Sequence, residues 1–424
     1  MRKNVWVLNH YATDMIGDHG GRHYWLAQEI KKRGYNPVIF ASNIVHNSEK
    51  QYDLNGKICR GITVDGLKFV LVKSTPYQGN GISRVENMIS YAINVIKAGK
   101  CYAKYCEKPD IIYASSVHPL TLLAGERLAK YFHIPCICEV RDLWPLTLIE
   151  YGILEEKSLI AKILYRGEKY IYKKADALIF TMEGGKQYIL DQGWERAIDL
   201  NKINYINNGI DLDRFYSNSE EYQIEDEDLE DKNSFKVVYA GSVRKVNDLL
   251  VLVRVAQKLQ NNPKVKILIW GSGDCVQMLK DSIKNSNLTN IKYKGVVQKQ
   301  YVPYILSKGN INLLHQILPK GMGKGKQINL LKYGTSQNKL FEYLASGNPV
   351  LFTLDSGYNL IDKYHCGLSL KKVNVQNIYN AIVKLSTMSE EERCVMGDNA
   401  RNLVRQYDFK VLAEKLIQII ESAF

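Results

Sequence analysis

Residues 333–351 read YGTSQNKLFEYLASGNPVL, a stretch in which one helix leads directly into one strand. Leu340 and Leu344 fall at helical spacing and predict a buried helix face. Gly347 and Pro349 end that helix, and an apolar run follows at once. A helix joined to a buried strand by so short a turn is the repeating unit of an α/β fold.

The same unit recurs along the whole chain. In the first half we expect strands at 5–8, 37–41, 68–72, 110–114, 135–140 and 177–181. In the second half we expect them at 235–240, 265–270, 291–294, 311–314 and 349–353. These runs are almost wholly apolar and alternate with amphipathic stretches, which is the pattern of parallel sheets covered by helices. The predicted fold class is therefore α/β, with two Rossmann-like domains whose parallel sheets face a central cleft.

An acidic stretch separates the two series of strands. Residues 217–233 carry one basic and eight acidic side chains and offer too little apolar surface to offset the cost of ordering. We therefore expect an N-terminal domain at 1–210, an exposed acidic linker at 211–234 and a C-terminal domain at 235–424. The last helix, at about 411–424, has an apolar face that can pack back on the N-terminal domain.

The composition is that of a globular protein, with 424 residues of which 46% are hydrophobic and 24% charged. It excludes collagen, a coiled coil and wholesale disorder. No run of about 18 apolar residues predicts a membrane-spanning helix, and the first apolar run is too short for a signal peptide. We therefore expect a cytoplasmic protein. The net charge is +13, with 27 basic and 13 acidic side chains in residues 234–424, which suits a phosphorylated ligand, an anionic membrane or another polyanion.

The quoted stretch also predicts an anion site at the start of its helix. Ser336 is a suitable N-cap, and the amides of Asn338, Lys339 and Leu340 then lack helical partners. Together with the lysine side chain they suit a phosphate group. Glu342 lies on the same side one turn further on, where a carboxylate can accept two hydrogen bonds from a ribose diol. An ordinary capped helix with a solvated lysine and glutamate is the alternative on spacing alone.

Glycine-rich turns follow two strands of the second half. Gly241 and Ser242 come directly after one strand and are followed by Arg244 and Lys245, and Gly271 comes directly after the next strand. Glycine lets a backbone approach phosphate closely, and the two basic side chains can neutralise it. No G-x-G-x-x-G occurs at either turn or after the first strand, which argues against a nicotinamide-dependent dehydrogenase.

Two strands of the first half end in polar residues. His118 follows the strand at 110–114, and Asp142 follows the strand at 135–140. The carboxyl ends of parallel strands meet at one edge of the sheet, which is where α/β domains bind ligands. No G-x-S-x-G elbow is present, so a Ser-His-Asp hydrolase is disfavoured.

Five motifs occur in a fixed order along the chain. They are GGRHY at 20–24, RDLWP at 141–145, NGID at 208–211, NIKYKGVV at 290–297 and the segment at 336–347. Together they resemble glycosyltransferase family 4, a retaining family with the GT-B fold. Within that family the chain looks like the subgroup resembling N-acetyl-L-fucosamine transferases of surface-polysaccharide synthesis. The resemblance covers nearly the whole chain.

The resemblance implies a nucleotide-sugar donor, with a UDP-sugar favoured, bound by the C-terminal domain. It implies that Glu342 contacts the ribose. It assigns the remaining donor contacts to Gly20, Gly21, Gly241, Ser242, Gly271, Val297, Ser336, Asn338, Lys339 and Leu340. It assigns catalytic roles to Asp142, His118, Arg244 and Lys245.

The chain departs from the family pattern at two places. The first of the family's two glutamates is replaced by Gly334, eight positions before Glu342, so the contact with the donor sugar is unassigned. The family's arginine and lysine after the second-domain glycine fall on Ser242 and Asn247, and Arg244 and Lys245 are assigned in their place.

The expected reaction transfers a sugar to an acceptor hydroxyl with retention at the anomeric carbon. No metal or cofactor is expected, because no Asp-x-Asp motif follows a strand where it would hold a diphosphate. The expected acceptor is a glycan or a polyprenyl-diphosphate-linked glycan of O-antigen or capsule synthesis. Lys97, Lys100, Lys104 and Lys108 recur in one helical stretch, which suits peripheral contact with the anionic inner face of the cell membrane. A solvated helix face is the alternative.

Three other classes of protein fit part of the pattern. A nucleotide-sugar 2-epimerase of the same fold would use the same donor site without an acceptor. A non-enzymatic polyanion-binding protein would use the basic half, although nucleic acid is not expected because no aromatic–basic recognition motif accompanies the charge. The third is an inactive donor-binding subunit, in keeping with the glutamate that Gly334 replaces.

Overall fold

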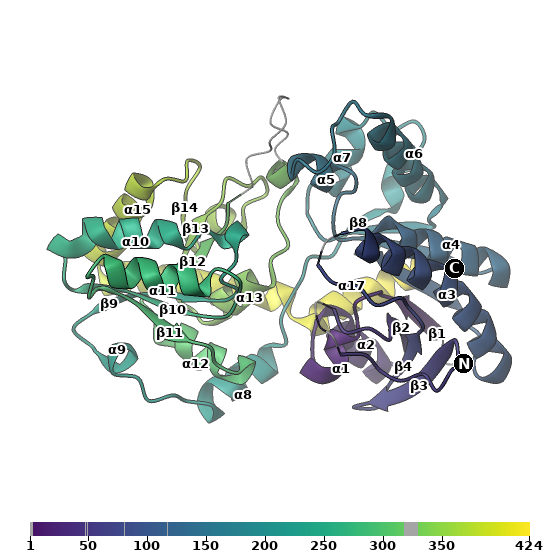
Figure 1. The fold of residues 1–424 in the computed structure, drawn as a ribbon, viewed down its shortest axis with the longest axis horizontal. Helices are drawn as coiled ribbons and strands as arrows, with labels where there is room; N and C mark the ends of the chain where they lie inside the picture. The colour runs from purple at the N-terminus through teal and green to yellow at the C-terminus, as the bar shows by residue number, and fades with distance from the viewer. Residues whose placement is uncertain (1–2, 47, 49, 80, 117, 318–329) are drawn as a thin grey trace. The chain divides into compact units, whose positions relative to one another are not determined.

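The computed structural model describes residues 3–424 except 47, 49, 80, 117 and 318–329. Two compact units share the chain (Figure 1). Unit 1 contains Met1–Asn207, Gly321–Ser336 and Phe409–Phe424, and unit 2 contains Asn208–Lys320 and Gln337–Asp408. The chain therefore returns twice to unit 1 after first leaving it.

Unit 1 is built around a sheet that has eight strands in its described residues, in the order β3-β4-β2-β1-β5-β6-β7-β8. The strands are β1 (Asn4–Leu8), β2 (Asn36–Ser42), β3 (Cys59–Val64), β4 (Leu67–Val72), β5 (Ile111–Ser116), β6 (Cys136–Val140), β7 (Ala177–Phe180) and β8 (Ile203–Tyr205). All neighbouring strands are parallel except β3, which runs antiparallel to β4. At the centre, Val7 of β1 is in register with Ile39 of β2 and Tyr113 of β5. The central strands are buried, which explains their continuous apolar sequence.

The helices of unit 1 are α1 (Asp14–Asp18), α2 (Arg22–Lys32), α3 (Ile82–Tyr105), α4 (Pro119–Phe132), α5 (Leu146–Glu150), α6 (Leu159–Lys174), α7 (Gly185–Asp191) and α17 (Phe409–Ser422). Helix α4 packs between α3 and α6, whereas α17 packs on α2 (Figure 1). Arg33, just past α2, donates from Nη2 to the Lys410 carbonyl (3.2 Å) and to Glu414 Oε1 (3.0 Å). The last helix of the chain thus lies on the N-terminal unit.

Close packing fixes the position of α4 against the sheet. A β-carbon built on Gly125 of α4 would lie only 2.6 Å from the β-carbon of Ala114 in β5. Glycine at this position therefore lets the helix approach the strand closely. This contact sets the place of His118, which immediately precedes α4.

Unit 2 contains a parallel sheet of six strands, counted over the residues that are described, in the order β11-β10-β9-β12-β13-β14. The strands are β9 (Phe235–Ala240), β10 (Val265–Trp270), β11 (Ile291–Gly295), β12 (Ile311–His315), β13 (Val350–Thr353) and β14 (Gly367–Ser369). The helices are α8 (Leu212–Glu221), α9 (Glu227–Glu230), α10 (Leu250–Lys258), α11 (Val276–Asn285), α12 (Val302–Ser307), α13 (Asn338–Ala345), α14 (Leu360–Lys363), α15 (Val375–Thr387) and α16 (Glu390–Val404). The predicted α/β class with two mainly parallel sheets is confirmed.

The acidic stretch at 211–234 is not a separate linker, because it belongs to unit 2. It contains α8 and α9, and Asp228 in α9 is buried. The Asp228 carboxylate accepts hydrogen bonds from Lys292 (2.8 Å) and Lys294 (2.7 Å) of the edge strand β11. Burial alone would raise the pKa of this carboxyl group, but these bonds hold it well below its usual range. Charge pairing with the edge strand therefore orders a segment whose composition predicts a loop.

The expected C-terminal domain at 235–424 is also interrupted. Tyr333 is buried in the core of unit 1, where its carbonyl accepts a hydrogen bond from Gly184 N (2.9 Å). The ring of Tyr333 packs edge-on against Tyr188, with 5.2 Å between centroids. Both this segment and α17 thus return to unit 1, because each has an apolar face that the N-terminal unit buries.

Candidate functional site

The predicted anion site lies at the start of α13. This helix begins at Asn338, with Gln337 rather than Ser336 in the N-cap position and no capping bond from the Gln337 side chain. Leu340 N donates to the Gln337 carbonyl (3.2 Å). Ser336 is therefore not the N-cap, and the Leu340 amide is not available to a ligand. Within the described chain, the amides of Asn338 and Lys339 have no hydrogen-bond acceptor.

Lys339 lies over the turn that follows β9. Its Nζ donates to the Tyr239 hydroxyl (2.9 Å) and stands 4.7 Å from the centroid of the Tyr239 ring. A β-carbon built on Gly241 would lie 2.5 Å from Lys339 Cδ, so the glycine makes room for the lysine. Burial lowers the pKa of Lys339 to about 8, while Glu342 opposes that shift. A bound anion would favour the charged form.

The turns after β9 and β10 pack backbone against backbone. Gly241 N donates to the Trp270 carbonyl (3.0 Å). Gly271 has a φ of +145°, and a β-carbon built on it would lie 1.7 Å from the Gly241 carbonyl oxygen. Only glycine fits there without a backbone shift. The structure thus brings Gly241, Gly271 and Lys339 together.

Glu342 is half-buried on α13, one turn after Lys339. Among the described residues no hydrogen bond or ion pair engages its carboxylate, although the charges of Lys299 and Lys339 act on it. Burial raises the pKa of Glu342, and the two lysines oppose that shift. A partly buried carboxylate that receives no protein hydrogen bond has its full acceptor capacity left for a ligand.

Tyr343 is a residue whose role the sequence did not reveal. Its hydroxyl donates to the Ala240 carbonyl (3.0 Å) and accepts from Ala240 N (3.1 Å), at the last residue of β9. These bonds hold α13 at the carboxyl end of the strand, where the Gly241 turn begins. The helical spacing in the quoted stretch predicts a helix here, but not that the Tyr343 hydroxyl bonds the end of a strand.

Two basic residues follow the Gly241 turn. Arg244 and Lys245 are exposed, and neither forms a side-chain hydrogen bond or ion pair with any residue described. Ser242 Oγ donates instead to Asn247 Oδ1 (2.9 Å). The structure therefore leaves Arg244 and Lys245 available in the turn without bringing them against Lys339.

Val297 is half-buried just beyond the end of β11. The preceding Gly295 carbonyl accepts a hydrogen bond from Gly271 N (2.9 Å). This bond places the turn that carries Val297 beside the Gly271 turn. Val297 therefore lies two residues beyond the backbone hydrogen bond that joins β11 to the Gly271 turn.

Gly20 and Gly21 lie between α1 and α2 in unit 1. Gly21 has a φ of +108° at the N-cap position of α2, which favours glycine. A β-carbon built on Gly21 would lie 3.1 Å from Met15 Cγ, and one on Gly20 would lie 3.5 Å from Trp25 Nε1. The turn is therefore packed against these two side chains.

Arg22 and His23 follow Gly21 in the GGRHY motif and belong to a buried ion cluster that is centred on Glu139 of β6. Arg22 donates from Nε (2.9 Å) and Nη2 (2.6 Å) to Glu139 Oε2, and His23 Nε2 lies 3.0 Å from Glu139 Oε1. The hydroxyls of Tyr113 and Ser115 donate to the same carboxylate. Burial opposes ionisation, but Arg22 and His23 hold the pKa of Glu139 well below its usual range. No expectation drawn from the sequence included this cluster.

His118 forms a buried pair with His10. His118 Nε2 lies 2.7 Å from His10 Nδ1, and burial lowers the pKa of both rings, that of His118 to about 3. Both imidazoles are therefore neutral near pH 7, so that one ring donates and the other accepts. His118 Nδ1 is buried and has no hydrogen-bond partner in the part of the chain that the structure describes.

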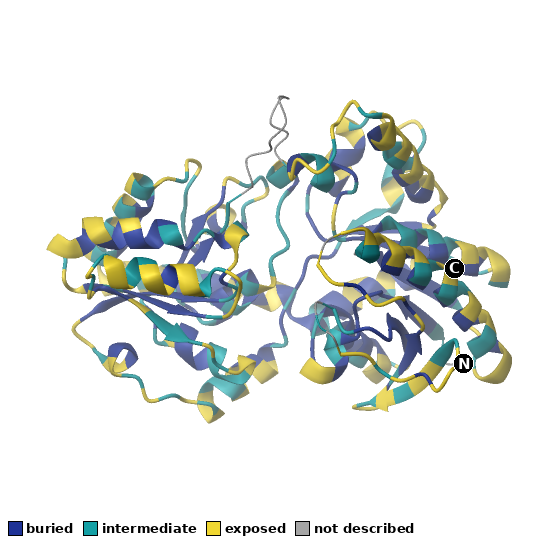
Figure 2. Cartoon of the chain, in the orientation of Figure 1, coloured by how far each residue is buried: buried dark blue, intermediate teal, exposed yellow. Residues whose placement is uncertain are grey.

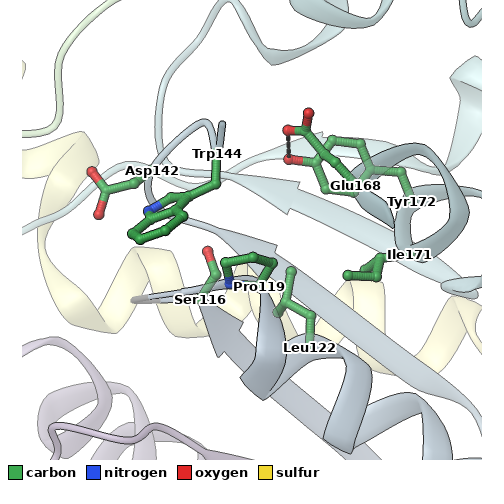
Figure 3. A pocket seen from close by; sticks show the side chains of 8 residues that line it. All are labelled: Ser116, Pro119, Leu122, Asp142, Trp144, Glu168, Ile171 and Tyr172. Atoms are coloured by element: carbon green, nitrogen blue, oxygen red, sulfur yellow. Dashed lines mark hydrogen bonds between the residues drawn. The ribbon is translucent and has the colours of Figure 1, made fainter. Parts of the chain in front are cut away.

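Asp142 lines a pocket of unit 1 next to the carboxyl ends of β5 and β6 (Figure 3). The residues around this pocket are Ser116, Pro119, Leu122, Asp142, Trp144, Glu168, Ile171 and Tyr172. Loss of hydration beside the neighbouring side chains raises the pKa of the Asp142 carboxyl group, whereas the positive charges of Arg141 and Arg84 oppose that shift. His118 and Asp142 thus follow adjacent strands of one sheet, as the sequence predicts.

The lysines that suggest a membrane surface are exposed. Lys97, Lys100 and Lys104 lie on α3, and Lys108 lies beyond its end. Lys100 Nζ stands 3.8 Å from the centroid of the Tyr131 ring. None of the described helices combines the length and the apolar character needed to cross a membrane.

Solved structures share the fold over nearly the whole chain. HepE from Anabaena, in complex with UDP, is 13% identical, with 99% of this chain and 100% of that chain covered and a TM-score of 0.64. A glycosyltransferase from Rickettsia africae ESF-5 is 16% identical, with 100% and 98% covered and a TM-score of 0.64. The α,α-trehalose 6-phosphate synthase from Burkholderia multivorans is 12% identical, with 100% and 99% covered and a TM-score of 0.68.

Two protein-family models match the sequence. Residues 24–214 match Glycosyltransferase Family 4, and residues 234–388 match Glycosyl transferases group 1. No curated protein matches the chain. From these two matches and the shared fold, the chain is a glycosyltransferase of the GT-B fold, with a family 4 region in its first half and a group 1 region in its second.

Proposed function

We propose that this glycosyltransferase moves a sugar from a nucleoside-diphosphate donor to a hydroxyl group of a glycan or of a polyprenyl-diphosphate-linked glycan, with retention of configuration. A UDP-sugar is the favoured donor, because HepE was solved with UDP-glucose and a similar structure from E. coli with UDP-2-fluoro-glucose. The proposed process is the synthesis of a surface polysaccharide such as O-antigen or capsule. The proposed place is the cytoplasmic side of the cell membrane, with peripheral contact.

The observation that carries the proposal is the arrangement on α13. The amides of Asn338 and Lys339 and the Lys339 ammonium group gather positive charge over the Gly241 turn. One turn away, the Glu342 carboxylate keeps its acceptor capacity. In the proposal the positive groups bind the diphosphate, and Glu342 accepts hydrogen bonds from the ribose diol. The base lies near Val297.

The proposed chemistry breaks the bond between the anomeric carbon and the diphosphate oxygen. The acceptor oxygen forms its new bond to the same face of that carbon, and its proton passes to the leaving phosphate. Negative charge grows on the diphosphate as the bond breaks, so Lys339 and the helix amides stabilise the transition state more than the ground state. Arg244 and Lys245 add positive charge from the neighbouring turn. We propose no metal or other cofactor, since these groups supply the charge that the leaving diphosphate needs.

Unit 1 supplies the acceptor side in this proposal. Gly20 and Gly21 let the backbone approach the donor sugar. The neutral ring of His118 exchanges a hydrogen bond with a sugar hydroxyl rather than supplying charge. Asp142 accepts a hydrogen bond from the acceptor hydroxyl. Because Gly334 stands where the family has a glutamate, these residues carry more of the sugar recognition.

Product analysis tests this proposal. UDP-sugars are incubated with the full chain, each with and without a polyprenyl-diphosphate-linked glycan, and the products are identified by nuclear magnetic resonance. We expect a glycoside whose anomeric configuration matches the donor, formed only when acceptor is present. A 2-epimer of the donor formed without acceptor, or a product of inverted configuration, would contradict the proposal.

A further inference from the structure

Helix α6 presents an apolar stripe to solvent. Leu159, Ile163 and Tyr170 are 71%, 55% and 53% exposed. They stand four and seven residues apart, so they lie along one side of the helix. Ile160 is 62% exposed next to them. The exposed residues along α6 can be followed in Figure 2. Four large apolar side chains of one helix are thus left in water.

The same side of α6 is basic. Lys162, Arg166, Lys173 and Lys174 are exposed and alternate with the apolar residues along the helix. The one acidic residue of α6, Glu168, points inward instead, where its carboxylate accepts hydrogen bonds from Tyr172 and Tyr188, both of 2.7 Å. Among the described residues of α6 itself, the outer face therefore carries basic but no acidic side chains, and the exposed acidic residues Glu155, Glu156 and Asp176 flank the helix.

The inner face of α6 already has its partners. Ala161 and Ile171 are buried, and the helix packs on α4. Glu168, Ile171 and Tyr172 also line the pocket that contains Asp142 (Figure 3). The fold consequently does not need the outer stripe, and the helix connects that outer face to the proposed acceptor side of the enzyme.

We propose that the outer face of α6, comprising Leu159, Ile160, Lys162, Ile163, Arg166, Tyr170, Lys173 and Lys174, docks on an anionic lipid bilayer. An apolar stripe bordered by lysine and arginine is the pattern of a helix that lies in the membrane interface: the apolar side chains enter the acyl boundary while the cations meet the phosphate groups. Docking by this face would hold the Asp142 pocket, which the inner face of α6 lines, about one helix diameter from the surface of the bilayer that holds the acceptor. The inference rests on the proposed function for the nature of the acceptor.

Vesicle sedimentation of the full chain tests the inference. The vesicles contain phosphatidylglycerol, with pure phosphatidylcholine as the uncharged comparison. The apolar variant is Leu159→Gln/Ile163→Gln, and the charge variant is Arg166→Glu/Lys173→Glu. A matched control, Met278→Gln/Val395→Gln, removes two exposed apolar side chains from unit 2. A fourth variant, Lys97→Glu/Lys100→Glu/Lys104→Glu, reports on α3.

We expect the wild type and the unit 2 control to sediment with the anionic vesicles, and each α6 variant to bind them about tenfold more weakly or worse. Equal sedimentation of wild type and both α6 variants would overturn the inference. So would a loss confined to the α3 variant, or a change of oligomeric state in the α6 variants without any vesicle binding by the wild type. UDP binding, measured on the same proteins, separates the two claims. Intact UDP binding with no vesicle binding refutes docking alone, whereas vesicle binding without UDP binding refutes the proposed donor site.

Discussion

Lys339 occupies the space that a side chain at position 241 would fill. A β-carbon on Gly241 would lie 2.5 Å from Lys339 Cδ and 2.9 Å from its Nζ. The lysine can therefore lie over the turn after β9 only because residue 241 is glycine. The two positions act as one unit in the proposed diphosphate site.

The first prediction concerns this pair. In Gly241→Ala the flexible end of Lys339 moves away while the backbone stays in place, so the fold survives and the cation is lost from the site. We expect the Kd for UDP to rise by about tenfold, in line with the loss of one charge-assisted hydrogen bond. Calorimetry checks this, with Gly17→Ala as control, because a β-carbon built on Gly17 meets nothing within 4 Å. Unchanged affinity in Gly241→Ala would show that Lys339 does not hold the diphosphate.

The second prediction is a pH dependence of donor binding. Burial lowers the pKa of Lys339 to about 8. A bound diphosphate favours the protonated lysine, so binding takes up a proton and the affinity for UDP should fall as the pH rises through about 8. Lys339→Arg keeps its charge throughout, and its affinity should stay flat from about pH 7.5 to 9.5. If the affinity for UDP falls to the same extent with pH in the wild type and in Lys339→Arg, Lys339 is not the titrating group.

The third prediction concerns the His10–His118 pair and acid stability. Burial lowers the pKa of His118 to about 3, from an ordinary value of 6.5 in the unfolded chain. Below pH 6.5 the unfolded chain therefore binds more protons than the folded one, and the free energy of unfolding declines until about pH 3. His118→Gln should reduce that slope by up to about 1.4 kcal/mol per pH unit, the limit for one proton, which is approached well below pH 6.5. Urea unfolding at pH 7 and pH 5 measures it, and equal slopes in both proteins would disprove the assignment.

The fourth prediction concerns the Glu139 cluster. Arg22→Met leaves the buried Glu139 carboxylate without the cation that donates two hydrogen bonds to its Oε2, and we expect a loss of about 3–5 kcal/mol in the free energy of unfolding. Arg22→Met/Glu139→Gln removes both charges and should recover part of that loss. Chemical denaturation compares the two. If the double variant is less stable than the single one, the carboxylate does not depend on Arg22.

Most of the fold was predictable because its strands are buried on both faces. The eleven strands expected from the sequence have counterparts in the structure, while three further strands, β3, β8 and β14, were not expected. All three lie at sheet edges. An edge strand is only half covered, so its sequence lacks a continuous apolar run. Asp65-Gly66, between β3 and β4, is a strong hairpin signal that would have identified β3.

The unit boundaries were less predictable than the strands. Asp228 is held in place by lysines of β11, and the nearer of them, Lys292, lies 64 residues away in the sequence. Tyr333 likewise finds its apolar surroundings in Tyr188 of the other half of the chain. Local composition does not reveal such distant partners. It therefore predicts a loop for the segment that contains Asp228 and the wrong unit for the segment that contains Tyr333.

The candidate site divides in the same way. The sequence placed Lys339 and Glu342 on one helix, because helical spacing fixes which residues share a face. It could not show that Lys339 meets Gly241 or that Tyr343 binds the end of β9, since these contacts depend on how the helix packs. The Glu139 cluster did leave a signal, which is a lone carboxylate inside an apolar strand.

The most direct test of the account is the binding of UDP to wild type and Glu342→Ala, measured by calorimetry beside GDP, ADP and CMP. Asp281→Ala, exposed on α11 of the same unit, serves as the control. The account predicts that the wild type and the control bind UDP most tightly among the four nucleotides. It also predicts that Glu342→Ala raises the Kd for UDP by about tenfold or more, with unchanged thermal stability, because the carboxylate makes its hydrogen bonds to the ribose and not to the protein. Equal affinity of wild type and Glu342→Ala, or no nucleotide binding by the wild type, would contradict it.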